Sequence, residues 1–136
     1  MAVVDASVII SAILPDDVHH QASKAWLDAQ VNSGRQFSAP AIVLSEVAAP
    51  LSRAFNQPVL AKKIVQSLIT APFVQLVPIS NTLAHRAAII AADYQIRGCD
   101  AVYVALAEAL GEELITLDKQ QGERANVVVE VSHPTF

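Results

Sequence analysis

Cysteine is almost absent from this sequence. The 136 residues contain one cysteine, Cys99, so the chain cannot form an intramolecular disulfide. This composition is typical of a reducing compartment, and we expect the protein to be cytoplasmic. Because no histidine adjoins Cys99 in the sequence, we interpret it as a small buried residue rather than a nucleophile.

Positive charge is also scarce. The chain has nine Lys and Arg against thirteen Asp and Glu, with a net charge of −4 and a pI near 5.4. These values exclude binding to nucleic acid through overall charge, but they leave room for a local basic rim. No Lys or Arg precedes the apolar N-terminal stretch, which Asp5 interrupts, so we expect no signal peptide. The longest uncharged stretch, 64–84, contains two prolines and is not expected to span a membrane.

Apolar residues, in contrast, make up 53% of the chain, and their runs are regularly spaced. Strand-like runs alternate with helical patterns: strands are expected at 2–5, 36–39, 73–78, 114–117 and 127–131, and helices at 7–14, 20–31, 40–53, 56–69, 81–96 and 101–110. This alternation predicts an α/β fold with a parallel sheet covered by helices on both faces, in a single domain over residues 1–136. Ligands of such folds gather beyond the carboxyl ends of the strands.

Two of the predicted strands run directly into an aspartate. Asp5 ends the first apolar run in "AVVDAS", and Asp118 ends a later one in "LITLDK". If both strands are parallel and central, both carboxylates emerge at the same edge of the sheet. The alternatives are a simple helix N-cap for Asp5 and an ordinary loop acid for Asp118. Ser7 and Thr116 are placed to orient these carboxylates or a bound water.

Two further acids lie on helices with few other polar residues. Asp100 is near the N-terminus of the apolar helix "RGCDAVYVALAEAL", where the helix dipole stabilises a carboxylate. Glu46 lies in "APAIVLSEVAAPLSR", on a face that is not otherwise charged. Its alternative role is an ion pair with Arg53. We interpret Tyr103 as a packing residue with its hydroxyl at the edge of the core.

A set of carboxylates without histidine is the donor set that a hard cation such as Mg²⁺ or Mn²⁺ prefers. Two carboxylates about 4 Å apart repel by roughly 4 kcal/mol at an effective dielectric near 20. Four converging acids form six such pairs, whose repulsion could exceed a typical net stability of roughly 5–15 kcal/mol. A converged site must therefore bind cations or retain protons.

Four segments of the chain resemble, in order, the four acidic motifs of PIN domains, and in particular of VapC-like toxins. They are "VVDASVII", "APAIVLSEV", "RGCDAVYVALAEAL" and "LITLDK". The resemblance implies a three-layer α/β/α fold with a central, mostly parallel sheet. It implies an endoribonuclease dependent on Mg²⁺ (or Mn²⁺), with catalytic and metal-binding acids Asp5, Glu46, Asp100 and Asp118 and supporting hydroxyls Ser7 and Thr116. It also implies an RNA substrate, a homodimer, and a cognate VapB-like antitoxin.

The loop after Asp118 departs from this pattern. Some members of the family carry another acid there, but "DKQQGERA" offers only Glu123, at a spacing that does not indicate a ligand. Gly122 is expected to weaken any short helix in this loop. Arg97 and Lys119 are candidates for contacts with RNA phosphates, with solvated surface charges as the alternative.

Other functional classes fit the sequence less well. A receiver-type phosphotransfer module needs an aspartate at the end of the third strand, which here reads "LVPIS". A dehalogenase-like phosphatase needs an aspartate two residues after Asp5, where Ser7 stands. A non-catalytic PIN-fold module that binds RNA or acts as a scaffold stays open as the alternative.

Overall fold

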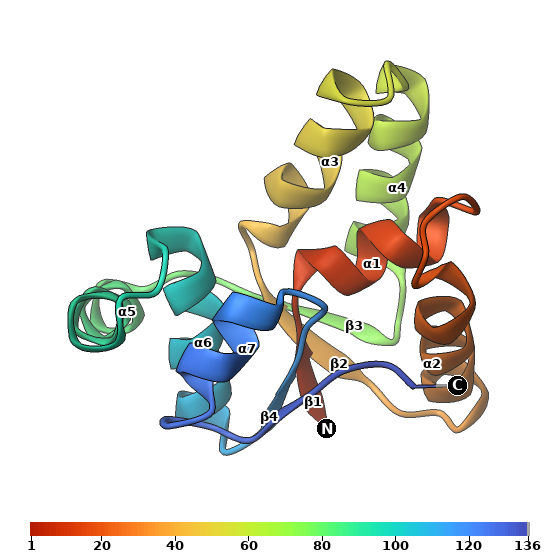
Figure 1. Ribbon diagram of the computed structural model, residues 1–136. Coiled ribbons are helices and arrows are strands. Elements are labelled where there is room, and N and C mark those ends of the chain that lie inside the picture. The colour runs from red at the N-terminus through yellow and green to blue at the C-terminus, as the bar shows by residue number, and fades with distance from the viewer. Residues whose placement is uncertain (136) are drawn as a thin grey trace.

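The computed structural model describes residues 1–135, which form one five-stranded sheet and seven helices (Figure 1). The strands are β1 (Ala2–Val4), β2 (Phe37–Pro40), β3 (Val74–Val77), β4 (Glu113–Ile115) and β5 (Val131–Ser132). The helices are α1 (Ala6–Ile13), α2 (His20–Asn32), α3 (Val43–Arg53), α4 (Pro58–Thr70), α5 (Asn81–Tyr94), α6 (Gly98–Leu110) and α7 (Lys119–Ala125). No helix in this part of the chain is long and apolar enough to cross a membrane.

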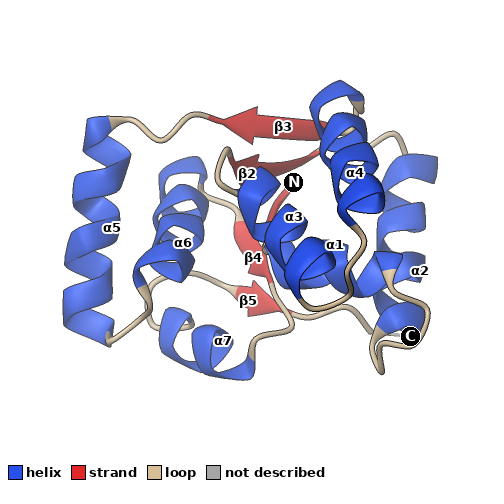
Figure 2. Ribbon diagram, turned by 90° about the horizontal axis from the view of Figure 1, so that it is seen from above, coloured by secondary structure: helices blue, strands red, loops and turns tan. Residues whose placement is uncertain are grey.

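The sheet has the strand order β3-β2-β1-β4-β5, and each strand is parallel to its neighbours. Figure 2 shows α5 and α6 on one side of the sheet and α1 to α4 on the other. Helix α6 packs against β1, β2 and β4, and its side chains Tyr103 and Leu106 are buried in the core with Val3 and Leu114 of the sheet. The prediction of a parallel sheet between two helical layers is therefore confirmed.

The register of the two central strands decides where the first and last acidic motifs meet. Val4 of β1 pairs with Ile115 of β4, and the Asp5 N–H donates to the Ile115 carbonyl at 2.9 Å. Both strands thus end at the same edge of the sheet, side by side. Segments more than 100 residues apart in the sequence, at Asp5 and Thr116, become direct neighbours.

Helices α3 and α4 pack against each other and rise above this carboxyl edge (Figure 1). The expectation that a helix begins at Pro40 is wrong, because Pro40 is the last residue of β2 and pairs with Val77. The N–H groups of Phe37 and Ala41 donate to the β3 side. Backbone N–H groups along a strand alternate between its two neighbours, so the nitrogen of Pro40 faces β1. The β1–β2 pairing has a single register pair, at Ser38, and Pro40 lies beyond it. The missing N–H of proline therefore costs no hydrogen bond between these strands.

The boundary between α5 and α6 also differs from the sequence prediction. The helix expected at 81–96 ends at Tyr94 and is not closed by Gly98, because Gln95 already takes the left-handed backbone conformation, with φ of 54°. Gly98 is instead the first residue of α6, and Arg97 occupies the N-cap position without a capping side-chain hydrogen bond. The earlier start of α6 leaves Cys99 exposed in its first turn, so the expectation that Cys99 is buried is wrong.

Helix α7 is absent from the sequence prediction, which treated Gly122 as unfavourable to it. A Cβ atom at position 122 would lie 3.3 Å from Val131 Cγ1 and 3.7 Å from Thr116 Cγ2. The glycine therefore lets the helix approach the sheet closely, and tertiary packing outweighs its low helix propensity. The expectation of a strand at 127–131 is wrong for 127–130, since β5 comprises only Val131 and Ser132 among the described residues.

The C-cap of α6 provides a stability test of this backbone. Gly111 has φ of 66°, and a Cβ atom at this position would meet no neighbouring atom of residues 1–135 within 4 Å. Gly111→Ala should lower the free energy of unfolding by about 1 kcal/mol through conformational strain alone. Urea denaturation measures the change. Gly98→Ala, also in open space but without a positive φ, is the control, and an equal loss in both variants would contradict this account.

Candidate active site

Asp5 is buried at the carboxyl end of β1, where it begins α1 as its N-cap. Its Oδ2 accepts hydrogen bonds from the Ser7 N–H at 3.1 Å and from the Thr116 hydroxyl at 3.3 Å. Within residues 1–135, no hydrogen bond reaches its Oδ1. The capping role and a ligating role are therefore compatible, because the cap occupies one carboxylate oxygen and leaves the other.

The hydroxyls of Ser7 and Thr116 join the ends of β1 and β4. Ser7 Oγ accepts from the Leu117 N–H at 3.1 Å and lies 3.5 Å from Thr116 Oγ1. Thr116 Oγ1 accepts from the Asp118 N–H at 3.0 Å. It also lies 2.8 Å from Gln121 Oε1, so its single proton is shared between that oxygen and Asp5 Oδ2. The two hydroxyls hold the loop that carries Asp118 against the strand that carries Asp5.

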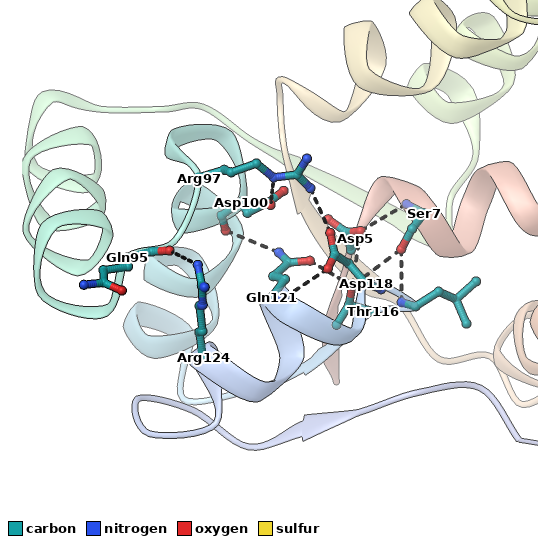
Figure 3. Close-up of polar contacts among 10 residues, drawn as sticks. Asp5, Ser7, Gln95, Arg97, Asp100, Thr116, Asp118, Gln121 and Arg124 are labelled. Atoms are coloured by element: carbon teal, nitrogen blue, oxygen red, sulfur yellow. Dashed lines mark hydrogen bonds and ion pairs between the residues drawn. The ribbon is translucent and has the colours of Figure 1, made fainter.

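Asp100 and Asp118 are bridged by Arg97 (Figure 3). Arg97 Nε donates to Asp100 Oδ2 at 2.9 Å, and Arg97 Nη2 donates to Asp118 Oδ2 at 2.8 Å. Asp118 is also the N-cap of α7, because its Oδ1 accepts from the Gln121 N–H at 3.0 Å. Asp118 therefore caps a helix rather than lying in an open loop, and Arg97 is an exposed side chain that nevertheless pairs with both acids.

Glu46 approaches this group from α3. It forms no ion pair with Arg53 in the part of the chain that the structure describes. Its Oε1 and the Tyr103 hydroxyl are both buried, and neither has a partner of full hydrogen-bond geometry among residues 1–135. A buried carboxylate oxygen without a partner is costly and needs an explanation, which a ligand reaching it would supply.

The electrostatics of Glu46 and Asp100 show that the acids act on one another. Burial raises the pKa of Glu46 above its usual range, and the negative charges of Asp5 and Asp100 add to this effect. The pKa of Glu46 is held down in part by the neighbouring Tyr103 hydroxyl and by Arg97.

Burial likewise raises the pKa of Asp100, against the opposing effect of Arg97, while the charges of Asp5 and Asp118 raise it further. Burial and the nearby carboxylates keep the pKa of Tyr103 far above its usual range, so its hydroxyl stays protonated. The site therefore concentrates negative charge in a partly desolvated place.

The donor set fits a hard divalent cation, since it consists of carboxylates without histidine and includes the unpartnered oxygen of Glu46. As they stand, no three Asp, Glu, His or Cys side chains among the described residues are grouped closely enough to hold a metal ion. Arg97, a cation of the chain itself, lies between Asp100 and Asp118 instead. The metal-binding role of the four acids stays a prediction.

A surface cavity of about 540 Å³ opens beside Asp118. It is lined by residues of α7, β5 and the flanking loops: His19, Thr116, Leu117, Asp118, Lys119, Gly122, Glu123, Asn126, Val131, Ser132 and His133. Lys119 lies on this cavity, is exposed and makes no ion pair within residues 1–135. Glu123 lines the same cavity. A volume in this range is ordinary for a small-ligand site.

Sequence reasoning missed the part that Gln121 plays. This side chain is buried, lies 2.8 Å from Thr116 Oγ1, and donates through Nε2 to the Asp100 carbonyl at 3.4 Å. It therefore links α7 to α6 across the site. No local pattern in "DKQQGERA" marks it, because its burial depends on α7 packing against the sheet. The Arg97–Asp100 contact, in contrast, has the (i, i+3) spacing that indicates an ion pair.

Comparison with known proteins places these features in a family context. The sequence matches the PIN domain family over residues 2–127. Among curated protein sequences, none matches this chain.

Several solved structures share the fold at low sequence identity. The sarcin–ricin loop-cleaving toxin VapC20 of Mycobacterium tuberculosis has a TM-score of 0.77 and 16% identity, over 90% of this chain and 94% of its own. FitAcB of Neisseria gonorrhoeae has a TM-score of 0.71 and 21% identity, over 96% of both chains. The DNA-bound VapBC of Salmonella typhimurium has a TM-score of 0.70 and 16% identity, over 97% of this chain and 96% of its own.

The raised pKa of Glu46 predicts a pH-dependent cost in the metal-free protein. Because the folded-state pKa lies above the unfolded value near 4.5, stability is lost as the pH rises through the folded pKa. Glu46→Gln should therefore raise Tm at pH 7 by roughly 2–5 °C, with less gain near pH 4. Thermal unfolding monitored by circular dichroism in EDTA provides the measurement. The exposed Glu130→Gln variant is the control, and a lower Tm for Glu46→Gln at pH 7 would refute this assignment.

Proposed function

This chain belongs to the PIN domain family, and from that premise we propose that it is a Mg²⁺- or Mn²⁺-dependent endoribonuclease, the toxin of a VapBC-type toxin–antitoxin pair. The proposed nuclease domain comprises residues 1–136. The observation that carries the proposal is the gathering of acids from four separate segments at one edge of the sheet, with Glu46 Oε1 buried and unpartnered within residues 1–135.

In this proposal Asp5 and Asp100 hold the cation directly, and Glu46 and Asp118 hold it directly or through water. When bound, a divalent cation lowers the pKa of a bound water and stabilises negative charge on phosphate oxygens. Thr116 and the Ser7 N–H keep Asp5 Oδ2 in place, so its other oxygen is free to face the site. Asp5 is thereby already oriented, whereas the other carboxylates must come closer together before they can hold a cation with it.

Glu46 is the better candidate for the general base. Its raised pKa brings its proton affinity closer to neutral pH, which suits a group that accepts a proton from an attacking water. Asp118 is the alternative, but both of its oxygens already accept hydrogen bonds, from Gln121 and from Arg97. The Tyr103 hydroxyl, buried in α6 and protonated, lies beside Glu46 and lowers the pKa of Glu46 rather than exchanging a proton itself.

The charge distribution is consistent with an RNA substrate. Apart from the four proposed ligands, nine Asp and Glu remain against nine Lys and Arg, so the rest of the surface is near neutral. Lys119 lies on the cavity beside Asp118 and is free to contact a phosphate. Arg97 is a second candidate, but only when it leaves the two carboxylates that it bridges.

The partners are proposed from the family resemblance and from what the proteins that share the fold were crystallised with. Those structures include a toxin–antitoxin complex from Klebsiella pneumoniae and VapBC2 from Rickettsia felis bound to a promoter DNA fragment. By analogy, we infer a homodimer and a cognate VapB-like antitoxin for this chain. A non-catalytic PIN-fold module that binds RNA is the alternative, and it requires no cleavage under any metal condition.

Asp5→Asn is the most direct test of catalysis. Asparagine caps a helix as well as aspartate does, so α1 should stay intact while the ligand charge is lost. Cleavage of mixed RNA in Mg²⁺ should fall at least about 100-fold, which corresponds to about 2.7 kcal/mol of transition-state stabilisation. Asp16→Asn, an exposed acid away from the site, is the control. Equal cleavage by Asp5→Asn would remove the role of Asp5, and no cleavage by the natural sequence would favour the binding module.

Metal binding should also be visible as stability. A cation that binds only the folded site raises Tm, and a tenfold excess over Kd adds about 1.4 kcal/mol to the free energy of unfolding. We expect millimolar Mn²⁺ or Mg²⁺ to raise Tm by several degrees in differential scanning fluorimetry and to raise it less in Asp5→Asn. A melting curve indifferent to either metal would contradict convergence of the four acids.

A further inference from the structure

Arg97 is the counterion of the acidic site. It is the one Lys, Arg or His residue within residues 1–135 whose side chain forms an ion pair with any of the four proposed ligands. It occupies Oδ2 of Asp100 and Oδ2 of Asp118 at the same time, at 2.9 and 2.8 Å. Figure 3 shows its guanidinium group extended from the start of α6 across to Asp118, above Asp5.

The electrostatic influence of Arg97 extends over the whole site. Burial raises the pKa of both Glu46 and Asp100, and the charge of Arg97 opposes this rise in each. Its own pKa is raised by Asp100, Asp118 and Asp5, so the guanidinium stays charged. Crowded carboxylates need a compensating cation, and in the absence of a metal Arg97 supplies one positive charge.

Arg97 is also free to leave. Its side chain is 73% exposed, whereas those of Asp100 and Asp118 are 13% and 27% exposed. It makes no capping hydrogen bond at the start of α6. The exposed guanidinium loses little by returning to water, whereas the two less exposed carboxylates need another cation in its place.

We propose that Arg97 is a built-in counterion that competes with the divalent cation for the carboxylate oxygens of Asp100 and Asp118, so that metal binding displaces its guanidinium group. The inference rests on the proposed metal site but not on RNA cleavage. The alternative role for Arg97 is a structural strut, meaning a side chain that holds Asp100 and Asp118 in place, and the two roles predict opposite effects of its loss on metal affinity. A strut would hold the two acids in place for the metal, and its loss would weaken metal binding.

Isothermal titration calorimetry with Mn²⁺ separates these two roles. Arg97→Gln should bind Mn²⁺ at least about threefold more tightly than the natural sequence, because the competing cation is gone. Arg97→Lys should fall between them, since an ammonium group cannot bridge two carboxylates with a planar fork. Arg35→Gln, at the amino-terminal edge of the sheet before β2, is the matched charge control and should leave the affinity unchanged.

Unchanged or weaker Mn²⁺ binding by Arg97→Gln would overturn the proposal. So would the absence of Mn²⁺ binding by both the natural sequence and Arg97→Gln at millimolar concentration. Tighter binding by Arg97→Gln in a protein that cleaves no RNA would support the counterion role while contradicting the nuclease. The two proposals therefore fail separately.

Displacement can also be observed in the natural sequence. Arginine Nε–H resonances report on the hydrogen bonds that the guanidinium donates, and the Arg97 signal is assigned by its loss in Arg97→Gln. Addition of Mg²⁺ should shift the Arg97 resonance. Arg86, whose Nε donates to Glu108 at 2.7 Å and which pairs with none of the proposed ligands, is the internal control and should not shift. An Arg97 resonance that stays unmoved at saturating Mg²⁺ would overturn displacement.

Discussion

The repulsion among carboxylates at the carboxyl edge of the sheet is the constraint around which this structure is organised. Parallel pairing of β1 with β4 brings Asp5 and Asp118 to one edge, and α3 and α6 add Glu46 and Asp100. Two carboxylates brought to about 4 Å from each other would repel by roughly 4 kcal/mol at an intermediate dielectric. The fold tolerates this cost because N–H groups, hydroxyls and one guanidinium group face the acids.

These compensating contacts also explain how one residue can serve both stability and chemistry. Asp5 and Asp118 are the N-caps of α1 and α7, so each satisfies backbone N–H groups that would otherwise lack a partner. Each cap uses one oxygen, Oδ2 of Asp5 and Oδ1 of Asp118. The remaining oxygen of Asp118 meets Arg97, and the remaining oxygen of Asp5 accepts no hydrogen bond within residues 1–135. A structural interpretation of these acids does not exclude a functional one.

The comparisons and the site geometry support different parts of the functional conclusion. Membership of the PIN domain family follows from the sequence match over residues 2–127, whereas solved structures at 13–22% identity establish the fold alone. Fold does not decide chemistry. The case for a nuclease therefore depends on local features of this chain, above all the desolvated Glu46 and the polar network around Asp5 and Thr116.

The sequence by itself determined the fold class and that Asp5 and Asp118 follow strands of the sheet, because hydrophobic periodicity and strand-end aspartates are local signals. Only the tertiary structure decided that Arg97 bridges Asp100 and Asp118, that Gln121 is buried, and that α7 forms despite Gly122. Each of these depends on the distance between segments remote in the sequence. Strand register and helix packing set such distances, and a local pattern of hydrophobic residues cannot predict them.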